Sequence, residues 1–212
     1  MTNQPYDIYI VGVGGQGVLT IAEIISDVAF RKGIPVNYFP TKGMAQRGGF
    51  VKAQLRLGHT IAGPSISAQS ADLVISMELS ESLKAVPFLR PGGEFMLYAN
   101  RWEPTAVMLG KAPYPTEDAV AGAIEKEGGR LHLLSEASLP RDSEKAVRPN
   151  IFVMGALLAD TRLNTLLSAE EVEADIAGRW PKAAEANRYA FREGMKAALS
   201  QNGRKEPERH DA

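Results

Sequence analysis

The sequence predicts an α/β fold: a Rossmann-like, doubly wound and mostly parallel sheet, followed by helices that close the C-terminal part. Short apolar runs alternate with helical patterns over most of the chain, and a glycine-rich turn follows the first run. From about residue 150 onward the patterns are helical. The 212 residues, of which 44% are apolar, suffice for one core. We therefore predict one domain over residues 1–199 and a disordered tail over residues 200–212.

The first strand is predicted over residues 7–13, where β-branched and other apolar side chains end at a glycine. A helix follows over residues 17–32, because apolar positions recur there every three or four residues and Gly33 stands at its C-terminal cap. Residues 34–39 are predicted to form a second strand. Residues 50–57 alternate apolar and polar side chains, which predicts a strand near an edge of the sheet with one face in water.

The middle of the chain continues this alternation. Apolar runs predict strands at residues 71–77, 94–99 and 130–134. Helices are predicted between them at residues 79–88 and 116–126, and an Arg-Pro-Gly-Gly turn precedes the strand at residues 94–99. Strands that alternate with helices are typical of a parallel sheet.

The C-terminal part is predicted to be helical. Asn150 is expected to cap a helix that contains Gly155. Ser168 and Glu171 have the spacing of a capping box at the start of the next helix. A last helix is predicted from about residue 181 to residue 199.

The composition excludes several kinds of chemistry in this chain. The 24 basic and 25 acidic residues give a net charge of −1, so bulk charge predicts neither a nucleic-acid partner nor a membrane partner. The absence of cysteine excludes disulfides, cysteine-bound iron–sulfur clusters, thiolate zinc sites and cysteine nucleophiles. The three histidines, His59, His132 and His210, are too scattered to predict a metal site. The N-terminus lacks a signal-peptide pattern and no apolar run could span a membrane, which predicts a cytoplasmic protein.

The glycine-rich turn has the spacing of a dinucleotide-binding fingerprint at Gly12, Gly14 and Gly17, with Gly15 in addition. Free amides at the start of the following helix would attract an anion such as pyrophosphate. A nicotinamide site usually adds an acidic residue at the end of the second strand, and here that position offers only Asn37. Three interpretations remain: a tight structural connection, another phosphate or partner contact, or a stand-alone NAD(P)-dependent dehydrogenase as the alternative function.

A second segment of interest lies in a window free of acidic residues between Asp27 and Asp72. This window holds six cations that could build a basic surface. Within it, residues 41–49 combine three glycines with Arg47, whose guanidinium can grip a phosphate or carboxylate with two hydrogen bonds. Loops at the carboxyl ends of strands are where α/β proteins place their sites, so we expect this loop to be functional. The six cations are Arg31, Lys32, Lys42, Arg47, Lys52 and Arg56.

Together the two motifs resemble a known family. The segments GVGGQGV at residues 12–18 and KGMAQRGG at residues 42–49 are similar to those of the gamma-type subunit or domain of the 2-oxoacid:ferredoxin oxidoreductases. The likeness is strongest to the beta subunits of the indolepyruvate:ferredoxin oxidoreductases, which carry this domain as a separate small chain. The segments NIFVMG at residues 150–155 and NRYAFREG at residues 187–194 extend the resemblance over most of the chain.

The resemblance implies a subunit of a complex that decarboxylates indolepyruvate or another aryl 2-oxoacid oxidatively. Coenzyme A would accept the acyl group, and ferredoxin or another acceptor would take the electrons. Thiamine diphosphate and the iron–sulfur clusters would belong to a large partner subunit, in agreement with the lack of cysteine here. The small subunit would border the partner's thiamine site, would help to bind coenzyme A at the interface, and would be inactive alone.

No catalytic residue and no tightly bound cofactor are predicted for this chain. The family often has a histidine just before GMAQRGG, where this chain has Thr41 and Lys42, so the role of that position stays open. The substrate stays open among indolepyruvate, phenylpyruvate and shorter 2-oxoacids. The candidate cofactor-facing residues are Gly12, Gly14, Gly15, Gln16, Gly17, Gly43, Met44, Gln46, Arg47, Gly48 and Gly49.

Overall fold

Six strands form one sheet in the order β2-β3-β1-β4-β5-β6, so that β2 and β6 are its edges. The computed structural model describes residues 4–41, 49–103, 105–110, 113–140 and 147–202. β1, β4, β5 and β6 are mutually parallel, whereas β3 runs antiparallel to both of its neighbours. The strands are β1 (Tyr6–Val13), β2 (Val36–Thr41), β3 (Phe50–Leu57), β4 (Ala71–Ser76), β5 (Leu89–Tyr98) and β6 (Arg130–Leu134).

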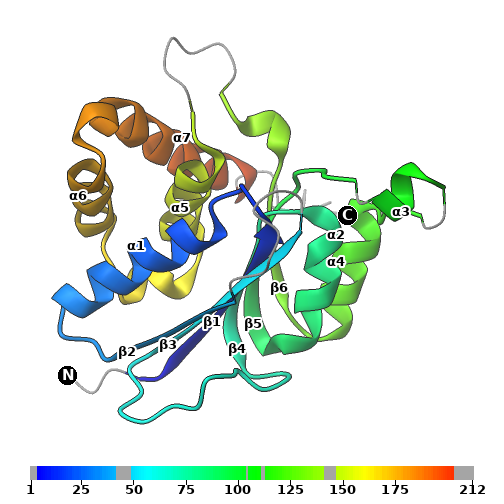
Figure 1. The fold of residues 1–212 in the computed structure, drawn as a ribbon, viewed down its shortest axis with the longest axis horizontal. Helices are drawn as coiled ribbons and strands as arrows, with labels where there is room; N and C mark the ends of the chain where they lie inside the picture. Colours follow the sequence, from blue (N-terminus) through cyan, green and yellow to red (C-terminus); the bar gives the residue numbers. More distant parts are fainter. Residues whose placement is uncertain (1–3, 42–48, 104, 111–112, 141–146, 203–212) are drawn as a thin grey trace, which may run out of the picture.

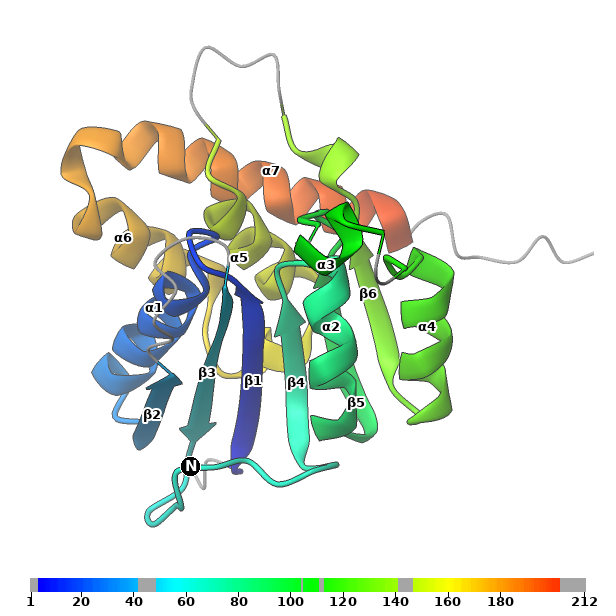
Figure 2. The same ribbon diagram turned by 45° about the vertical axis from the view of Figure 1, so that its right-hand side comes forward.

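Helices cover both faces of the sheet, which confirms the predicted doubly wound α/β fold (Figures 1 and 2). One face carries α1 (Val18–Arg31), α5 (Pro149–Asp160), α6 (Ala169–Arg179) and α7 (Ala184–Asn202). The other face carries α2 (Leu79–Ala85) and α4 (Glu117–Lys126), and the short α3 (Thr105–Met108) projects beyond the carboxyl ends of the strands. The core has two parts, one on each face of the sheet. Along β1, Ile8 and Ile10 belong to the part beneath α1, α5, α6 and α7, and Tyr9 and Val11 belong to the part beneath α2 and α4. This strand is therefore buried on both faces, as its continuous apolar run predicts.

The strand at residues 50–57 differs from its prediction in exposure, and it is the part of the sheet that is not parallel. As β3 it lies next to the edge strand, between β2 and β1, and it is antiparallel to both. The face predicted to be in water is largely covered: Gln54 is buried and its Oε1 accepts a hydrogen bond of 2.7 Å from the backbone of Ile66. The side chain of Arg56 on the same face binds Asp7.

Several element boundaries also differ. The Arg-Pro-Gly-Gly segment lies inside β5, where the pairing with β4 shifts register. The helix predicted to end at residue 88 ends as an α-helix at Ala85 and continues as a 3-10 turn, Val86–Phe88. Helix α7 begins three residues after the predicted start and runs to Asn202, and residues 203–212 lie outside the described part of the chain.

Two of the predicted helix ends are confirmed and one is wrong. Ser168 and Glu171 form a reciprocal capping box at α6, and Gly33 follows α1 with a φ of 73°. Asn150 does not cap α5, because the helix already begins at Pro149, with Arg148 at the N-cap position. Proline is favoured in the first turn, since its missing N–H has no partner there in any case.

Helices α5 and α7 cross at two glycines. A Cβ atom at Gly155 would lie 1.9 Å from the carbonyl oxygen of Phe191, and one at Gly194 would lie 1.8 Å from that of Phe152. The two helix backbones therefore approach more closely than any side chain would allow. This contact joins the last helix to the core.

A buried histidine ties the edge strand β6 to the helical layer. His132 Nδ1 lies 2.8 Å from Asp160 Oδ2 and Nε2 lies 3.5 Å from Glu94 Oε1. Burial alone would favour the neutral ring, but the two carboxylates outweigh burial and raise the pKa of His132 above its ordinary 6.5. Burial likewise opposes the charge of Glu94, yet His132 and the backbone N–H of Arg162 hold the pKa of Glu94 below its ordinary 4.5.

These shifts predict a pH-dependent contribution to stability. Because the pKa of His132 is raised in the folded protein, its protonated ring stabilises the fold fully below pH 6.5, and this stabilisation is lost as the pH rises through the folded pKa. Because the pKa of Glu94 is lowered, its carboxylate stabilises the fold above pH 4.5, and this stabilisation is lost as the pH falls through the folded pKa. We expect His132→Asn to lower the free energy of unfolding most between these two pH values, measured by urea unfolding with circular dichroism. A loss that is equal at about pH 5.5 and about pH 8.5 would contradict the assignment.

Candidate functional site

The two glycine-bearing motifs meet at the carboxyl end of β1. The backbone N–H of Gly14 donates a hydrogen bond of 2.8 Å to the carbonyl of Gly49, directly before β3. The remaining candidates of the second motif, Gly43, Met44, Gln46, Arg47 and Gly48, lie outside the described residues. The structure therefore places the first motif and the end of the second motif side by side.

The glycine turn uses its glycines for two different purposes. Gly15 and Gly17 have φ values of 101° and 80°, which favour glycine. Gly12 lies inside β1, where a Cβ atom would come within 2.9 Å of the side chains of Gln16, Val18 and Met77. Gly12 is therefore required for packing beneath the turn.

Gln16 holds the turn in place from within. Its Oε1 accepts a hydrogen bond of 2.8 Å from the backbone of Val13, and its Nε2 donates one of 2.8 Å to Asn100 Oδ1. Asn100 follows β5, so this side chain links the ends of two parallel strands. Because both polar atoms of the Gln16 side chain are hydrogen-bonded within the protein, we assign Gln16 a structural role in the wall of the site.

Two helix N-termini converge at this turn. Helix α1 begins at Val18, and its N-cap Gly17 lies against the side chain of Asn150 in the first turn of α5. Neither helix has a side-chain cap at its N-terminus, and neither first turn contains an acidic residue. By contrast, Thr116 and Ser168 cap α4 and α6, and both first turns contain acids. The positive ends of α1 and α5 therefore combine over one spot without a neutralising carboxylate in either first turn.

A pocket of about 750 Å³ opens at this point. It contains both tryptophans of the chain, Trp102 and Trp180, and among the described residues that line it Arg148 alone carries a charge. The guanidinium of Arg148 lies 5.3 Å from the ring centre of Trp180. An aromatic wall, a cation and free helix amides suit a ligand with an aromatic ring and a negative group. The lining residues are Gly14, Gly15, Gln16, Gly17, Thr20, Met77, Tyr98, Asn100, Trp102, Arg148, Pro149, Asn150 and Trp180.

Sequence reasoning missed the residues that give this pocket its character. Trp102 follows β5, whereas Arg148 precedes α5 and Trp180 follows α6, so no local motif connects them. Asn100 and Trp102 could have been suspected, because residues just past a parallel strand reach the ligand-binding edge of the sheet. Arg148 and Trp180 carry no such signal.

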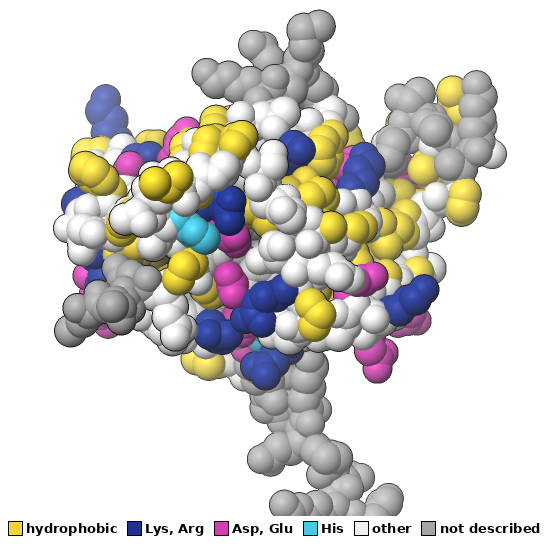
Figure 3. Space-filling model, turned by 90° about the horizontal axis from the view of Figure 1, so that it is seen from below, with side chains coloured by type: hydrophobic (Ala, Val, Ile, Leu, Met, Phe, Trp, Pro, Cys, Tyr) yellow, Lys and Arg dark blue, Asp and Glu magenta, His cyan; other side chains and the backbone are white. Residues whose placement is uncertain are grey.

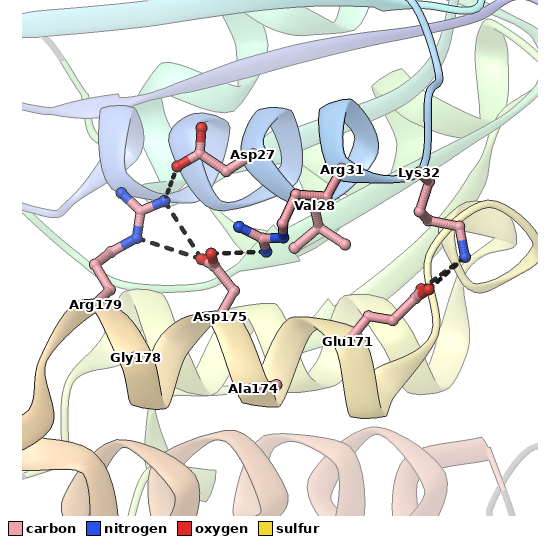
Figure 4. Close-up of a pocket in the computed structure, with 9 residues that line it drawn as sticks. All are labelled: Asp27, Val28, Arg31, Lys32, Glu171, Ala174, Asp175, Gly178 and Arg179. Atoms are coloured by element: carbon pink, nitrogen blue, oxygen red, sulfur yellow. Dashed lines mark hydrogen bonds and ion pairs between the residues drawn. The ribbon is translucent and has the colours of Figure 1, made fainter.

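A second hollow, of about 730 Å³, lies between α1 and α6 (Figure 4). Its charged side chains bind each other: Lys32 lies 2.7 Å from Glu171, Arg31 lies 2.8 Å from Asp175, and Arg179 reaches Asp175 and Asp27. These ion pairs fasten α6 to α1. The hollow is therefore better explained as a structural contact than as a ligand site.

The same ion pairs change the interpretation of the acid-free window. Arg31, Lys32 and Arg56 bind acids from distant segments, Asp175, Glu171 and Asp7. At the amino ends of the parallel strands, basic side chains lie beside acidic ones (Figure 3). These three cations therefore do not form the predicted basic surface. Lys42 and Arg47 lie outside the described residues.

The strand order explains why the turn lacks a nicotinamide partner. A dinucleotide site needs the end of the second strand beside the first, but β3 separates β2 from β1 here. The side chain of Asn37 is also engaged, because its Nδ2 donates a hydrogen bond of 3.2 Å to the carbonyl of His59. The geometry therefore gives the nicotinamide alternative no support.

Two other features are absent from the described part of the chain. Its helices are too short or too polar to cross a bilayer. Its histidine, aspartate and glutamate side chains do not form a group of three or more that could hold a metal ion.

The fold and the site define an α/β protein with a Rossmann-like glycine turn and a pocket at the carboxyl edge of its sheet. The chain belongs to the pyruvate ferredoxin/flavodoxin oxidoreductase family, whose sequence pattern matches residues 7–197. It is 34% identical over 200 residues to the indolepyruvate oxidoreductase subunit IorB of Thermococcus kodakarensis, covering 93% of this chain and 98% of that protein.

Solved structures show the same fold. The gamma subunit of a keto/oxoacid ferredoxin oxidoreductase from Geobacter sulfurreducens PCA matches with a TM-score of 0.62 and 22% identity, covering 93% of this chain and 98% of that one. The 2-oxoglutarate:ferredoxin oxidoreductase of Magnetococcus marinus matches with a TM-score of 0.64 and 18% identity, covering 93% of this chain and 32% of that one. The fold therefore occurs both as a separate chain and as part of a longer one. Neither these proteins nor the relative above is, by name, a nicotinamide-dependent dehydrogenase.

Proposed function

We propose that this chain is the small subunit of a 2-oxoacid:ferredoxin oxidoreductase complex and that its pocket binds part of coenzyme A beside the partner's active site. The substrate class is an aryl pyruvate, indolepyruvate above all, since the relative with 34% identity is an indolepyruvate oxidoreductase subunit. The reaction joins decarboxylation of the oxoacid and acyl transfer to coenzyme A with electron transfer to ferredoxin or another acceptor.

The observation that carries the proposal is the pocket at the two uncapped helix N-termini. Coenzyme A has an adenine ring and several phosphates, and the pocket offers Trp102 and Trp180 for stacking and Arg148 for charge. The amides at the starts of α1 and α5 add partial positive charge at the same place. The Magnetococcus marinus enzyme was solved with coenzyme A and succinyl-CoA bound, which agrees with this assignment.

The large partner subunit supplies the remaining groups in this proposal. Iron–sulfur clusters bind to that subunit, because the present chain has no cysteine to ligate them. Thiamine diphosphate is assigned to the same subunit, as the family resemblance implies. The glycine turn, together with Gly49 directly before β3, forms the rim that faces the partner. This chain positions coenzyme A, and the partner carries out the oxidation.

The test uses the complex assembled with its large subunit, with indolepyruvate and a ferredoxin or dye acceptor. Arg148→Ala is expected to raise KM for coenzyme A by about tenfold, because a charged hydrogen bond is lost, while KM for the oxoacid and kcat stay within about twofold. Arg192→Ala is the matched control, since Arg192 of α7 binds Glu173 of α6 and does not line the pocket. An unchanged KM for coenzyme A in Arg148→Ala would refute the pocket assignment.

Two further measurements address the assembly of the complex. Arg47→Ala is expected to leave the fold intact and to lower either the use of coenzyme A or the yield of the complex, measured by co-purification. The isolated chain is expected to show no oxoacid-dependent acceptor reduction. Turnover by the isolated chain would contradict its role as a subunit.

A further inference from the structure

Residues 101–103, 105–110 and 113–114, the described part of a segment that we call the arm, include α3, which projects beyond the carboxyl ends of the strands (Figure 2). Three of its apolar side chains are exposed: Trp102 by 50%, Met108 by 73% and Leu109 by 62%. Trp102 also lines the pocket. The position of the arm therefore decides whether the pocket has one of the two tryptophans that line it.

Both ends of the arm bind the same carboxylate oxygen. Glu78 follows β4 and is fully buried. Its Oε1 accepts a hydrogen bond of 3.2 Å from the backbone of Trp102, near the start of the arm, and another from the hydroxyl of Tyr114, at its end. Closing a segment by joining its two ends lowers its conformational freedom.

The other oxygen of Glu78 serves the body of the protein. Its Oε2 accepts a hydrogen bond of 2.8 Å from the backbone N–H of Glu81, so Glu78 is the N-cap of α2. The same oxygen accepts one of 2.7 Å from the hydroxyl of Ser80. Glu78 thus fixes the arm to the start of a helix that packs on the sheet. The carboxylate accepts from four donors, so its burial is well compensated.

Two neighbouring contacts strengthen this junction. The guanidinium of Arg101 lies 4.4 Å from the ring centre of Tyr114, a cation–π contact across the base of the arm. The backbone N–H of Leu79 donates a hydrogen bond of 3.0 Å to the carbonyl of Asn100. Asn100 in turn accepts a hydrogen bond from Gln16, so a continuous path joins the glycine turn to the arm.

The hydroxyl of Tyr114 remains a donor over the whole working range of pH. Burial is the largest cause, followed by the hydrogen bond to Glu78 and then by the negative charge of Glu78, and all three raise the pKa of this phenol. Glu78 and Tyr114 therefore form an acceptor–donor pair that does not break by ionisation of the tyrosine.

We infer that Glu78 is a positioning residue: by binding both ends of the arm through one oxygen, it holds Trp102 as a wall of the pocket. The geometry that carries this inference belongs to the chain itself. Its consequence for coenzyme A rests on the proposed function.

Substitutions can separate the two oxygens. In Glu78→Gln one oxygen becomes an NH₂ donor, which must face either the donors of Trp102 and Tyr114 or those at the start of α2. Tyr114→Phe removes the hydroxyl that donates to Glu78 and accepts a hydrogen bond of 3.3 Å from the backbone of Trp102, and both of these bonds are on the arm side. Ser80→Ala removes a bond on the helix side only and is the matched control.

The experiment follows Trp102 by fluorescence in the full chain. The chain has two tryptophans, so Trp180→Phe leaves Trp102 as the reporter. On this background, Glu78→Gln and Tyr114→Phe are expected to make Trp102 more accessible to acrylamide and to lower its anisotropy, whereas Ser80→Ala keeps both at the parent values. Where Glu78→Gln does not fold by circular dichroism, Tyr114→Phe provides the test. Folded variants with unchanged quenching and anisotropy would overturn the inference.

Kinetics of the assembled complex, with both tryptophans present, separate this inference from the proposed function. Tyr114→Phe is expected to raise KM for coenzyme A by about fivefold with kcat unchanged, since one hydrogen bond to the wall is lost. A more mobile Trp102 with an unchanged KM would support the role of Glu78 and count against the coenzyme A assignment. An immobile Trp102 with a raised KM would overturn the role of Glu78 and leave the coenzyme A assignment standing.

Discussion

Replacing Gly194 or Gly155 with alanine is expected to destabilise the protein by about 3 kcal/mol or more, a large share of the stability of an ordinary domain. A Cβ atom at either position would lie within 2 Å of a backbone carbonyl oxygen of the other helix, 1.8 Å for Gly194 and 1.9 Å for Gly155. Backbone atoms cannot move aside as a flexible side chain can. Helices α5 and α7 would have to separate, which opens the core between Phe152 and Phe191.

The measurement is urea unfolding of the full chain followed by circular dichroism. Gly122→Ala is the matched control, because Gly122 lies within α4 and a Cβ atom there would meet nothing within 4 Å. This control is expected to gain about 0.5–1 kcal/mol from helix propensity alone. Equal behaviour of the three variants would show that α5 and α7 do not cross as described.

Gly17→Ala is expected to have the second largest effect and to act at the pocket. The φ of 80° costs alanine about 1–2 kcal/mol in a left-handed conformation. The new methyl group would also lie 2.4 Å from Nδ2 of Asn150, so that side chain must move. We expect a total loss of roughly 3 kcal/mol, with a displaced α5 N-terminus and weaker coenzyme A binding.

Gly15→Ala separates the two causes. Gly15 has a φ of 101°, but a Cβ atom there would meet nothing within 4 Å, so this variant carries backbone strain alone. The double variant Gly17→Ala with Asn150→Ala should recover part of the loss, because two of the three closest atoms are removed. If Gly17→Ala cost no more than Gly15→Ala in urea unfolding, the contact between the turn and α5 would be unimportant.

Much of the fold could be predicted because its signals are local. The apolar runs of β1 and β4 are buried on both faces, and such runs are strong evidence for parallel strands. The alternating pattern of β3 is more typical of an antiparallel strand than of a buried parallel one, so its direction could have been suspected, although alternation alone does not fix which strands it pairs with. The prediction for Asn150 is wrong because Pro149, a good first-turn residue, comes directly before it.

The site could be predicted only in part, for a similar reason. The glycine turn is recognisable from its local spacing, and its contact with Gly49 places the second motif at the same edge. The tryptophans and Arg148 come from three separate segments, and only the packing of α5 on the sheet and of α6 against α1 and α7 brings them together. The charge of the acid-free window misleads for the opposite reason, since the acids that neutralise Arg31 and Lys32 lie about 140 residues further along the chain.

The place of β2 at the edge of the sheet bears on how this protein joins other chains. Pro40 lies in this strand and has no N–H, so β2 offers one backbone donor fewer to a strand of another chain that would extend the sheet there. Edge-to-edge aggregation of subunits through β2 is therefore disfavoured. Association through side-chain surfaces, which can fit one particular neighbour and exclude others, is favoured instead.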